Sequence, residues 1–321
     1  MEKMSLPKIA QRIPDESAAY EFMEELRWHG RPVCPHCGSI GEHYFLTPRK
    51  GTRETSTGKA SFRRLWKCRD CREQFSVLTG TIMHGTHVPI RTWVLVIFEM
   101  VSSKNGVASR EIERKYGLSP KTAWFLLHRI REGMRRDPVA SLFSGVVVAD
   151  ETWIGGAPKN RHANKRNPNA RQGLTVKTPV VSLISAETGE VRSKVVANVS
   201  GDTLKSVIVE HVTMAKTTLH TDAAGPYTTF AHELAAHASV NHSAGEYVRH
   251  GVSTNKAENY FSQLKRSIDG THHHVSPEHL PLYLSEFDFR FSTHDETDAA
   301  RMGRLMGQVS GRRLTYRPVV A

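Results

Sequence analysis

The spacing of the cysteines restricts the fold of this chain more than any other feature. The 321 residues contain four cysteines, in two CxxC pairs, Cys34 with Cys37 and Cys68 with Cys71. An interval of two residues lets both thiolates of a pair turn toward one ion, and two pairs supply the four sulfur ligands of a tetrahedral zinc site. Chance pairs and a redox dithiol are the alternative interpretations. Because four thiolates leave no open coordination position, the spacing predicts one structural zinc ion.

The N-terminal region is expected to contain a helical lead-in, residues 1–30, and a zinc ribbon, residues 31–82. Aromatic and basic residues in "SFRRLWKCRDC" lead into the second cysteine pair, as expected for a strand that ends in a metal-binding turn. The stretch "TPRKGTRETSTGKA" between the pairs is rich in turn-forming residues, and we expect the tip of a hairpin there.

The charge balance of the chain indicates its partner and not its fold. It has 44 Lys+Arg against 32 Asp+Glu, a net charge of +12 and a pI near 9.7. Such a balance suits a polyanion such as nucleic acid. The longest apolar run, near "TWVLVIFEM", is far shorter than the ~20 residues that span a bilayer, and the first residues lack the apolar core of a signal peptide. We therefore expect a cytoplasmic, nucleoid-associated protein that binds nucleic acid and no membrane.

Residues 88–136 are predicted to form a helix-turn-helix-like DNA-binding region. A short helix over residues 109–116 stops at Gly117, Ser119 is a suitable N-cap, and Pro120 fits the first position of the next helix. Any two packed helices would give a similar pattern, which is the alternative interpretation. In the second helix we expect four polar side chains on the outside: Lys121, His128, Arg129 and Arg131. Of these, Lys121, Arg129 and Arg131 are the candidate DNA contacts.

From residue 143 the pattern changes to strands and predicts one domain over residues 143–295. Three strands are followed by helix, strand, helix, strand and helix, which is the order of a ribonuclease-H-like domain. The basic stretch "APKNRHANKRNPNARQG" after the first strand is either a solvated loop or a phosphate clamp. The candidate phosphate contacts in it are Lys159, Arg161, Lys165 and Arg166. Residues 296–321 form an uninformative C-terminal tail.

Three carboxylates occupy positions that such a domain brings together. We expect Asp150 at the end of the first strand and Asp222 at the end of the fourth, and these two strands are neighbours in a ribonuclease-H-like sheet. Glu258 lies on the following helix, on the polar face opposite the apolar face that packs on the sheet. A lone strand-end aspartate is more often a cap, but three converging carboxylates repel unless hard cations lie between them. The pattern predicts two catalytic Mg²⁺ or Mn²⁺ ions that act on a phosphodiester.

The order and spacing of six segments resemble one known family. The segments are "LRWHGRPVCPHCGS", "WKCRDCREQFSVLTGTIM", "VVADETWIGG", "HTDAAGPY", "STNKAENYFSQLKRSIDGTHHHVS" and "YLSEFDFRFS". With them the chain resembles insertion-sequence transposases of the IS1595 group, which have an ISXO2-like catalytic domain. The resemblance implies an N-terminal zinc ribbon and a DDE-type catalytic domain. Together with the pattern of elements, it leads us to expect an α/β fold class: a ribonuclease-H-like mixed sheet with helices, preceded by the zinc ribbon and a helix-turn-helix segment.

The same resemblance implies a DDE-type enzyme that cuts transposon ends and joins their 3′-hydroxyls to target DNA. Its partner would be double-stranded DNA, both element ends and target, and the active complex would be a homo-oligomer. There are 35 residues between Asp222 and Glu258, an interval familiar from DDE enzymes. The catalytic set would consist of Asp150, Asp222 and a third residue, which is Glu258, Asn255 or both. Two basic residues on the same helix, Lys265 and Arg266, are candidate DNA contacts. Lys265 is also a candidate catalytic residue.

Two other functions remain open. A catalytically inactive, transposase-derived DNA-binding regulator would keep the ribbon and the helix-turn-helix while the acids only hold structure. A nuclease without strand transfer would use the same acids.

Overall fold

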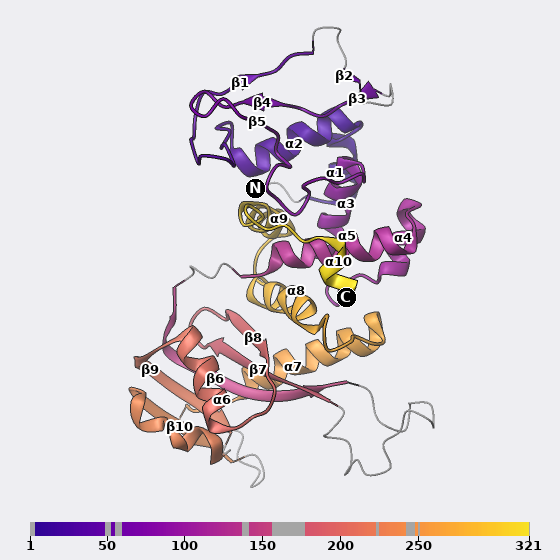
Figure 1. Ribbon diagram of the computed structural model, residues 1–321. Helices are drawn as coiled ribbons and strands as arrows, with labels where there is room; N and C mark the ends of the chain where they lie inside the picture. The colour runs from indigo at the N-terminus through magenta and orange to yellow at the C-terminus, as the bar shows by residue number, and fades with distance from the viewer. Residues whose placement is uncertain are drawn as a thin grey trace. The chain divides into compact units, whose positions relative to one another are not determined.

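The computed structural model describes residues 4–48, 53–54, 60–136, 141–155, 177–222, 225–241, 248–249 and 251–320 (Figure 1). The chain divides into two compact units. The first, called here the helical unit, combines Met1–Met134 with Asp295–Ala321, and the second, the sheet unit, is Arg135–His294. The sheet unit is therefore inserted between two segments of the helical unit. Among these described residues, no helix is long and apolar enough to cross a membrane.

The helical unit begins with two helices, α1 (Leu6–Arg12) and α2 (Glu16–Trp28). Glu24 of α2 is only 9% exposed, and its carboxylate accepts hydrogen bonds from the Trp66 indole and the Arg64 guanidinium, both at 2.9 Å. Because Trp66 and Arg64 belong to the cysteine-rich region, the lead-in helix and the ribbon pack together as one body.

The ribbon consists of short strands. β1 (Tyr44–Phe45), β4 (Trp66–Lys67) and β5 (Gln74–Phe75) form an antiparallel sheet in that order. β2 (Arg53–Glu54) and β3 (Ala60–Ser61) pair antiparallel within the stretch where a hairpin tip was expected. Residues 49–52 and 55–59 of that stretch lie outside the described residues.

Three further helices follow, α3 (Ile90–Ser102), α4 (Ser109–Tyr116) and α5 (Pro120–Met134). α4 ends at Gly117, whose φ of 63° is the left-handed conformation that favours glycine. The amide of Thr122 donates to the Ser119 hydroxyl at 3.2 Å, which confirms the predicted N-cap of α5.

The C-terminal segment is part of the core of the helical unit and not an uninformative tail. α9 (Asp298–Gly307) packs against α2, α3 and α5 and is followed by α10 (Tyr316–Val320). Met302, Leu305 and Met306 are fully buried. A Cβ atom on Gly133 of α5 would lie 3.2 Å from Leu305 Cδ1, so the glycine lets the two helices approach closely.

The sheet unit contains one five-stranded mixed sheet in the order β10-β9-β6-β7-β8. β9 is parallel to both β6 and β10, whereas β6, β7 and β8 are antiparallel neighbours. This arrangement confirms the predicted ribonuclease-H-like fold, with the first and fourth strands side by side. The elements are β6 (Phe143–Ile154), β7 (Thr178–Ser185), β8 (Val191–Val195), α6 (Gly201–His211), β9 (Val212–Asp222), β10 (Ala236–Val240), α7 (Asn255–Ser267), the π-helical turn η7 (Ile268–His272) and α8 (Leu280–Ser292).

The predicted helix between β9 and β10 is wrong. Two 3₁₀ segments take its place, η4 (Gly225–Thr229) and η5 (Ala231–Glu233). Tyr227 and Phe230 are 1% and 2% exposed, and their spacing of three residues matches the repeat of a 3₁₀ turn, which presents both rings to the sheet.

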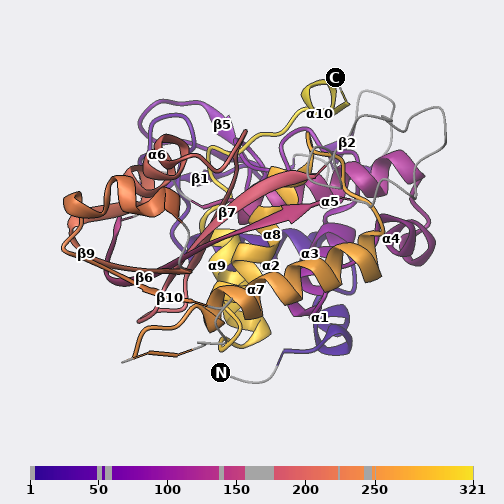
Figure 2. The same ribbon diagram turned by 90° about the horizontal axis from the view of Figure 1, so that it is seen from below.

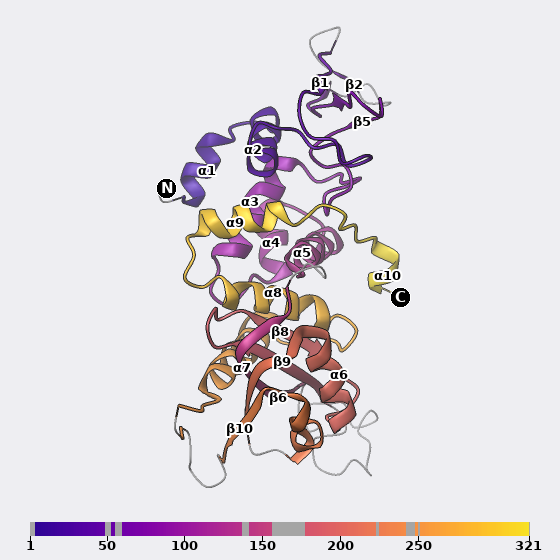
Figure 3. The same ribbon diagram turned by 90° about the vertical axis from the view of Figure 1, so that its left-hand side faces the viewer.

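Helices cover both faces of the sheet (Figures 2 and 3). α7 and α8 pack on one face, against side chains that include Val148 and Val180. α6 and η4 pack on the other, against side chains that include Val147 and Val181. Adjacent residues of a strand thus serve different cores, which is the alternation expected of a strand covered on both sides.

Candidate active site

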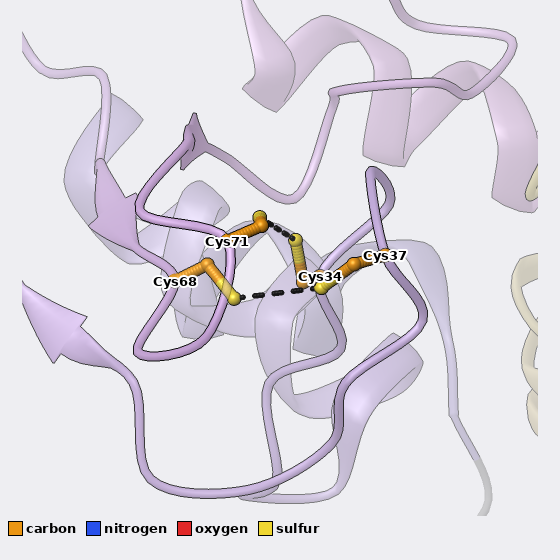
Figure 4. Close-up of side chains that lie close together, drawn as sticks. All are labelled: Cys34, Cys37, Cys68 and Cys71. Carbon is orange, nitrogen blue, oxygen red and sulfur yellow. Dashed lines mark hydrogen bonds between the residues drawn. The ribbon is translucent and has the colours of Figure 1, made fainter.

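The four cysteines point toward one another from two turns of the ribbon (Figure 4). The Sγ atoms of Cys34 and Cys71 are 3.7 Å apart, as are those of Cys37 and Cys68, and all four lie within 4.8 Å of one another. A disulfide needs ~2.05 Å, whereas the edge of a tetrahedron with zinc–sulfur bonds of ~2.3 Å is about 3.8 Å. The cluster therefore fits a structural zinc ion.

Asp150 and Asp222 lie on adjacent parallel strands and on the same face of the sheet. The pairing of β6 with β9 joins Val148 to His220, and this register, continued for two residues, brings Asp150 beside Asp222. Side-chain alternation places both on the face covered by α7, where Val148 also lies. Asp222 is the last residue of β9, as expected.

The expectation that Asp150 ends its strand is wrong. β6 continues to Ile154, because the pairing with β7 extends as far as Ile154 opposite Thr178. Only the pairing with β9 stops before Asp150. The aspartate thus lies where the parallel neighbour ends and the antiparallel neighbour continues.

α7 presents the two predicted faces. Its apolar face is buried through Ala257, Tyr260, Phe261, Leu264 and the following Ile268. The polar residues on the other side, all expected to contribute to the site, are exposed: Asn255, Glu258, Lys265 and Arg266.

The pKa of Asp150 is raised by burial and by the acidic residues around it. Burial, the largest cause, and the negative charges of Glu151, Asp222 and Glu258 together raise the pKa of Asp150 to about 7. The Glu151 amide, which donates to Oδ1 at 2.7 Å, acts in the opposite direction. Among the described residues, the four cysteines are the one group of three or more His, Cys, Asp or Glu side chains placed to hold a metal ion. The carboxylates are thus close enough to interact electrostatically without gathering as tightly as the thiols.

Glu151 has a separate role that sequence reasoning missed. As the next residue on β6 it points to the opposite face, where the hydroxyl of the buried Tyr227 donates to its carboxylate. Burial raises the pKa of Glu151, and the charge of Asp222 raises it further. The alternation of side chains along a strand could have separated the two adjacent acids, because neighbours in a strand face different layers.

The predicted outward placement of Arg129, Arg131 and His128 is wrong. Arg129 is 7% exposed, and its guanidinium donates to the carbonyl oxygens of Ile82 and of His84, the latter at 2.8 Å. It also lies over the Trp93 ring, 5.0 Å from the centroid. Arg131 and His128 are 1% and 0% exposed. α5 is covered on more sides than the helix of a two-helix unit would be, so these residues are unavailable to DNA in this structure.

The remaining predicted DNA contacts fall into two groups. Lys121, at the start of α5, is exposed and accessible to a phosphate. Four others lie outside the described residues: Lys159, Arg161, Lys165 and Arg166.

Comparison with known proteins agrees with this organisation. A family model of the ISXO2-like transposase domain matches residues 142–292, and a model of the transposase zinc-ribbon domain matches residues 14–74. An uncharacterized protein in transposable element ISH50 of Halobacterium salinarum is 24% identical over 285 residues, which cover 86% of this chain and 90% of that protein.

A likeness to a solved structure is weaker. The cryoEM structure of the simian T-cell lymphotropic virus intasome in complex with PP2A regulatory subunit B56 gamma matches with a TM-score of 0.28 and 12% identity. The match covers 60% of this chain and 65% of the viral chain, which is less than two-thirds of the viral chain's length.

The two family models are both transposase models, and the ISH50 protein comes from a transposable element. The chain belongs to the IS1595 group of transposases.

Proposed function

We propose that this protein binds the ends of its own insertion sequence, hydrolyses a phosphodiester bond at each end and joins the 3′-hydroxyls to target DNA. The observation that supports this most is the half-buried Asp150, whose pKa is raised to about 7 by burial and by the charges of Glu151, Asp222 and Glu258. A carboxylate held in a negative environment is stabilised by a bound cation, which removes the repulsion.

The donor set suits hard cations. Asp150, Asp222 and Glu258 offer carboxylate oxygens, the ligands that Mg²⁺ and Mn²⁺ prefer. Two such ions, when bound, would supply Lewis-acid stabilisation of the attacking and leaving oxygens of a phosphodiester. The protein residues bind the ions and orient the strand to be cut.

Glu258 is our choice as the principal third acidic residue. Its charge contributes to the raised pKa of Asp150, which indicates that the two carboxylates interact. Asn255 lies one turn earlier on the same exposed face, and we assign it a neutral contact with metal or DNA. The exposed Lys265 and Arg266, about two turns beyond Glu258, would contact backbone phosphates.

DNA binding rests on charge and on the helical unit. The net charge of +12 favours association with DNA, and Lys121 is exposed at the start of a capped helix. An insertion sequence has two ends, which must be held together for joining, so we propose a homo-oligomer in the active complex.

The test is incubation of the full-length protein with Mg²⁺ or Mn²⁺ and DNA that carries the ends of its element, beside DNA with scrambled ends. We expect nicked ends and joined products only with the true ends. Tight binding without cutting under either metal would instead identify a regulator, and cutting without joining would identify a nuclease. Comparison of Glu258→Gln with Asn255→Ala tests the third residue, and a more severe loss in Asn255→Ala would reverse our choice.

A further inference from the structure

A row of polar side chains starts at Asp150 and crosses the apolar layer beneath α7 and α8. Asp150 on β6 is opposite Ser182 on β7, and Ser182 is opposite Ser193 on β8. Val180 and Ile184 on either side of Ser182 belong to the core that α7 and α8 cover, so alternation puts Ser182 on that same face. Ser182 is fully buried, and its hydroxyl lies 2.8 Å from that of Ser193.

The row ends at a carboxylate on α8. Asp288 accepts three hydrogen bonds: from the Ser193 amide at 2.8 Å, the Ser193 hydroxyl at 2.7 Å and the Tyr260 hydroxyl at 2.6 Å. Since Ser193 gives its one hydroxyl proton to Asp288, the proton between the two serines comes from Ser182. Burial raises the pKa of Asp288 to about 6, against the donors that lower it, so the carboxylate is ionised at pH 7.5. Hydrogen bonds to an ionised acceptor are the stronger kind.

Tyr260 brings this cluster to α7. It is 1% exposed and lies two residues after Glu258 on the same helix. Apart from Ser267, the other buried side chains of α7 are apolar, and apolar contact is non-directional. A hydrogen bond has a required length and angle. The bond from Tyr260 to Asp288 of α8, together with the bonds from Ser193 of β8 to the same carboxylate, therefore restricts how α7 can rotate or slide on the sheet.

We propose that Tyr260 and Asp288 are positioning residues, which fix α7 on the sheet so that Glu258 is held toward Asp150. The importance of this for catalysis rests on the proposed function. The positioning itself is a property of the fold and can be measured separately.

The helical unit offers a matched control. There the Tyr116 hydroxyl donates to Glu99 Oε1 at 2.6 Å, the same chemistry and length, in the unit that lacks the three acids. Tyr260→Phe and Tyr116→Phe each remove one hydroxyl and keep the ring, and we expect both full-length variants to fold. Any general effect of losing a tyrosine–carboxylate bond should appear in both.

The first measurement is Mn²⁺ binding to the full-length protein, followed by electron paramagnetic resonance with Mn²⁺ alone as the probe. Loss of an outer residue that orients a metal ligand costs about 10–100-fold in affinity. We expect Asp150→Asn to abolish Mn²⁺ binding and Tyr260→Phe to weaken the Mn²⁺ affinity by about tenfold. Tyr116→Phe should leave the Mn²⁺ affinity within about twofold of the wild-type value. Asp288→Asn should act like Tyr260→Phe, because an amide NH₂ cannot accept from Ser193. Unchanged Mn²⁺ affinity in Tyr260→Phe would overturn the proposal.

The second measurement is hydrogen exchange, which needs no metal. The amides of Ala257 and Glu258 donate to the Thr254 carbonyl at 2.9 and 3.1 Å. They should exchange at least several-fold faster in Tyr260→Phe than in the wild type or in Tyr116→Phe. If wild-type Mn²⁺ binding proves independent of Asp150, the proposed function fails, and the exchange rates alone decide the positioning: faster exchange in Tyr260→Phe supports it, and equal rates overturn it.

Discussion

Replacing Asp150 by Asn should stabilise the metal-free protein while removing its activity. The carboxyl has a pKa of about 7 in the folded chain against an ordinary value of 3.8 for aspartate, because burial and neighbouring charges disfavour its ionised form. A folded-state pKa above the unfolded value means that the folded chain holds a proton that the unfolded chain releases. Stability therefore falls as pH rises from about 4 to about 7, and the full cost is present above that window.

The expected size follows from the shift. One pKa unit corresponds to about 1.4 kcal/mol, so a shift of about three units costs on the order of 4 kcal/mol at pH 8 and about 1–2 kcal/mol at pH 5. Asn cannot ionise, and its Oδ1 can still accept from the Glu151 amide. The free energy of unfolding of Asp150→Asn, relative to that of the wild type, should thus rise by about 2–3 kcal/mol from pH 5 to pH 8.

Urea unfolding of both proteins at pH 5 and pH 8, with and without Mg²⁺, measures this. Mg²⁺ should stabilise the wild type at pH 8 by mass action and leave Asp150→Asn unchanged. The reasoning is refuted if the variant is less stable by the same amount at both pH values, or if Mg²⁺ stabilises both proteins equally.

The remaining predictions concern the helical unit. Cys37→Ser should lose the zinc and unfold the ribbon, because metal binding and folding are coupled in such modules; full zinc content by elemental analysis would contradict this. Leu305→Ala should lower the free energy of unfolding by about 2–5 kcal/mol, as a buried residue of α9, whereas the exposed Leu6→Ala should change it by about 0.5 kcal/mol or less; equal effects in urea unfolding would show that α9 is not core. Lys121→Ala should keep the fold and reduce the salt dependence of DNA binding by about one unit of slope, while Arg129→Ala should lower stability through its lost bonds to residues 82 and 84; the reverse pattern in salt titrations and unfolding would restore Arg129 as a DNA contact.

The sheet could be predicted because its signals are local. Apolar strands with turn residues between them predicted the succession of strands along the chain. The helical period of residues 255–268 separated the two faces of α7. Acids at corresponding positions of the first and fourth strands then had to meet, since these strands are neighbours in such a fold. The same period-2 alternation assigns Asp150 and Glu151 to opposite faces, a signal present in the sequence but not used.

The errors arise from contacts that are distant in sequence. The burial of Arg129 depends on carbonyl groups of residues 82–84 and on the Trp93 ring, which no helical period reveals. α9 completes a core whose other helices lie some 200 residues earlier, as the bond from Arg301 to the Val101 carbonyl illustrates. The apolar positions 302, 305 and 306 of this short helix do follow helical spacing, but the pattern does not identify the partner.

The most direct test of the account is Mg²⁺-dependent cleavage of element-end DNA by wild-type protein and by Asp150→Asn, with DNA binding measured on the same samples. We expect the wild type to nick the ends, and Asp150→Asn to bind the DNA with equal affinity yet cut at no detectable rate, because an amide is a far poorer ligand for Mg²⁺ than a carboxylate. Cleavage by Asp150→Asn at the wild-type rate would contradict the assignment of the acids as the metal-binding centre.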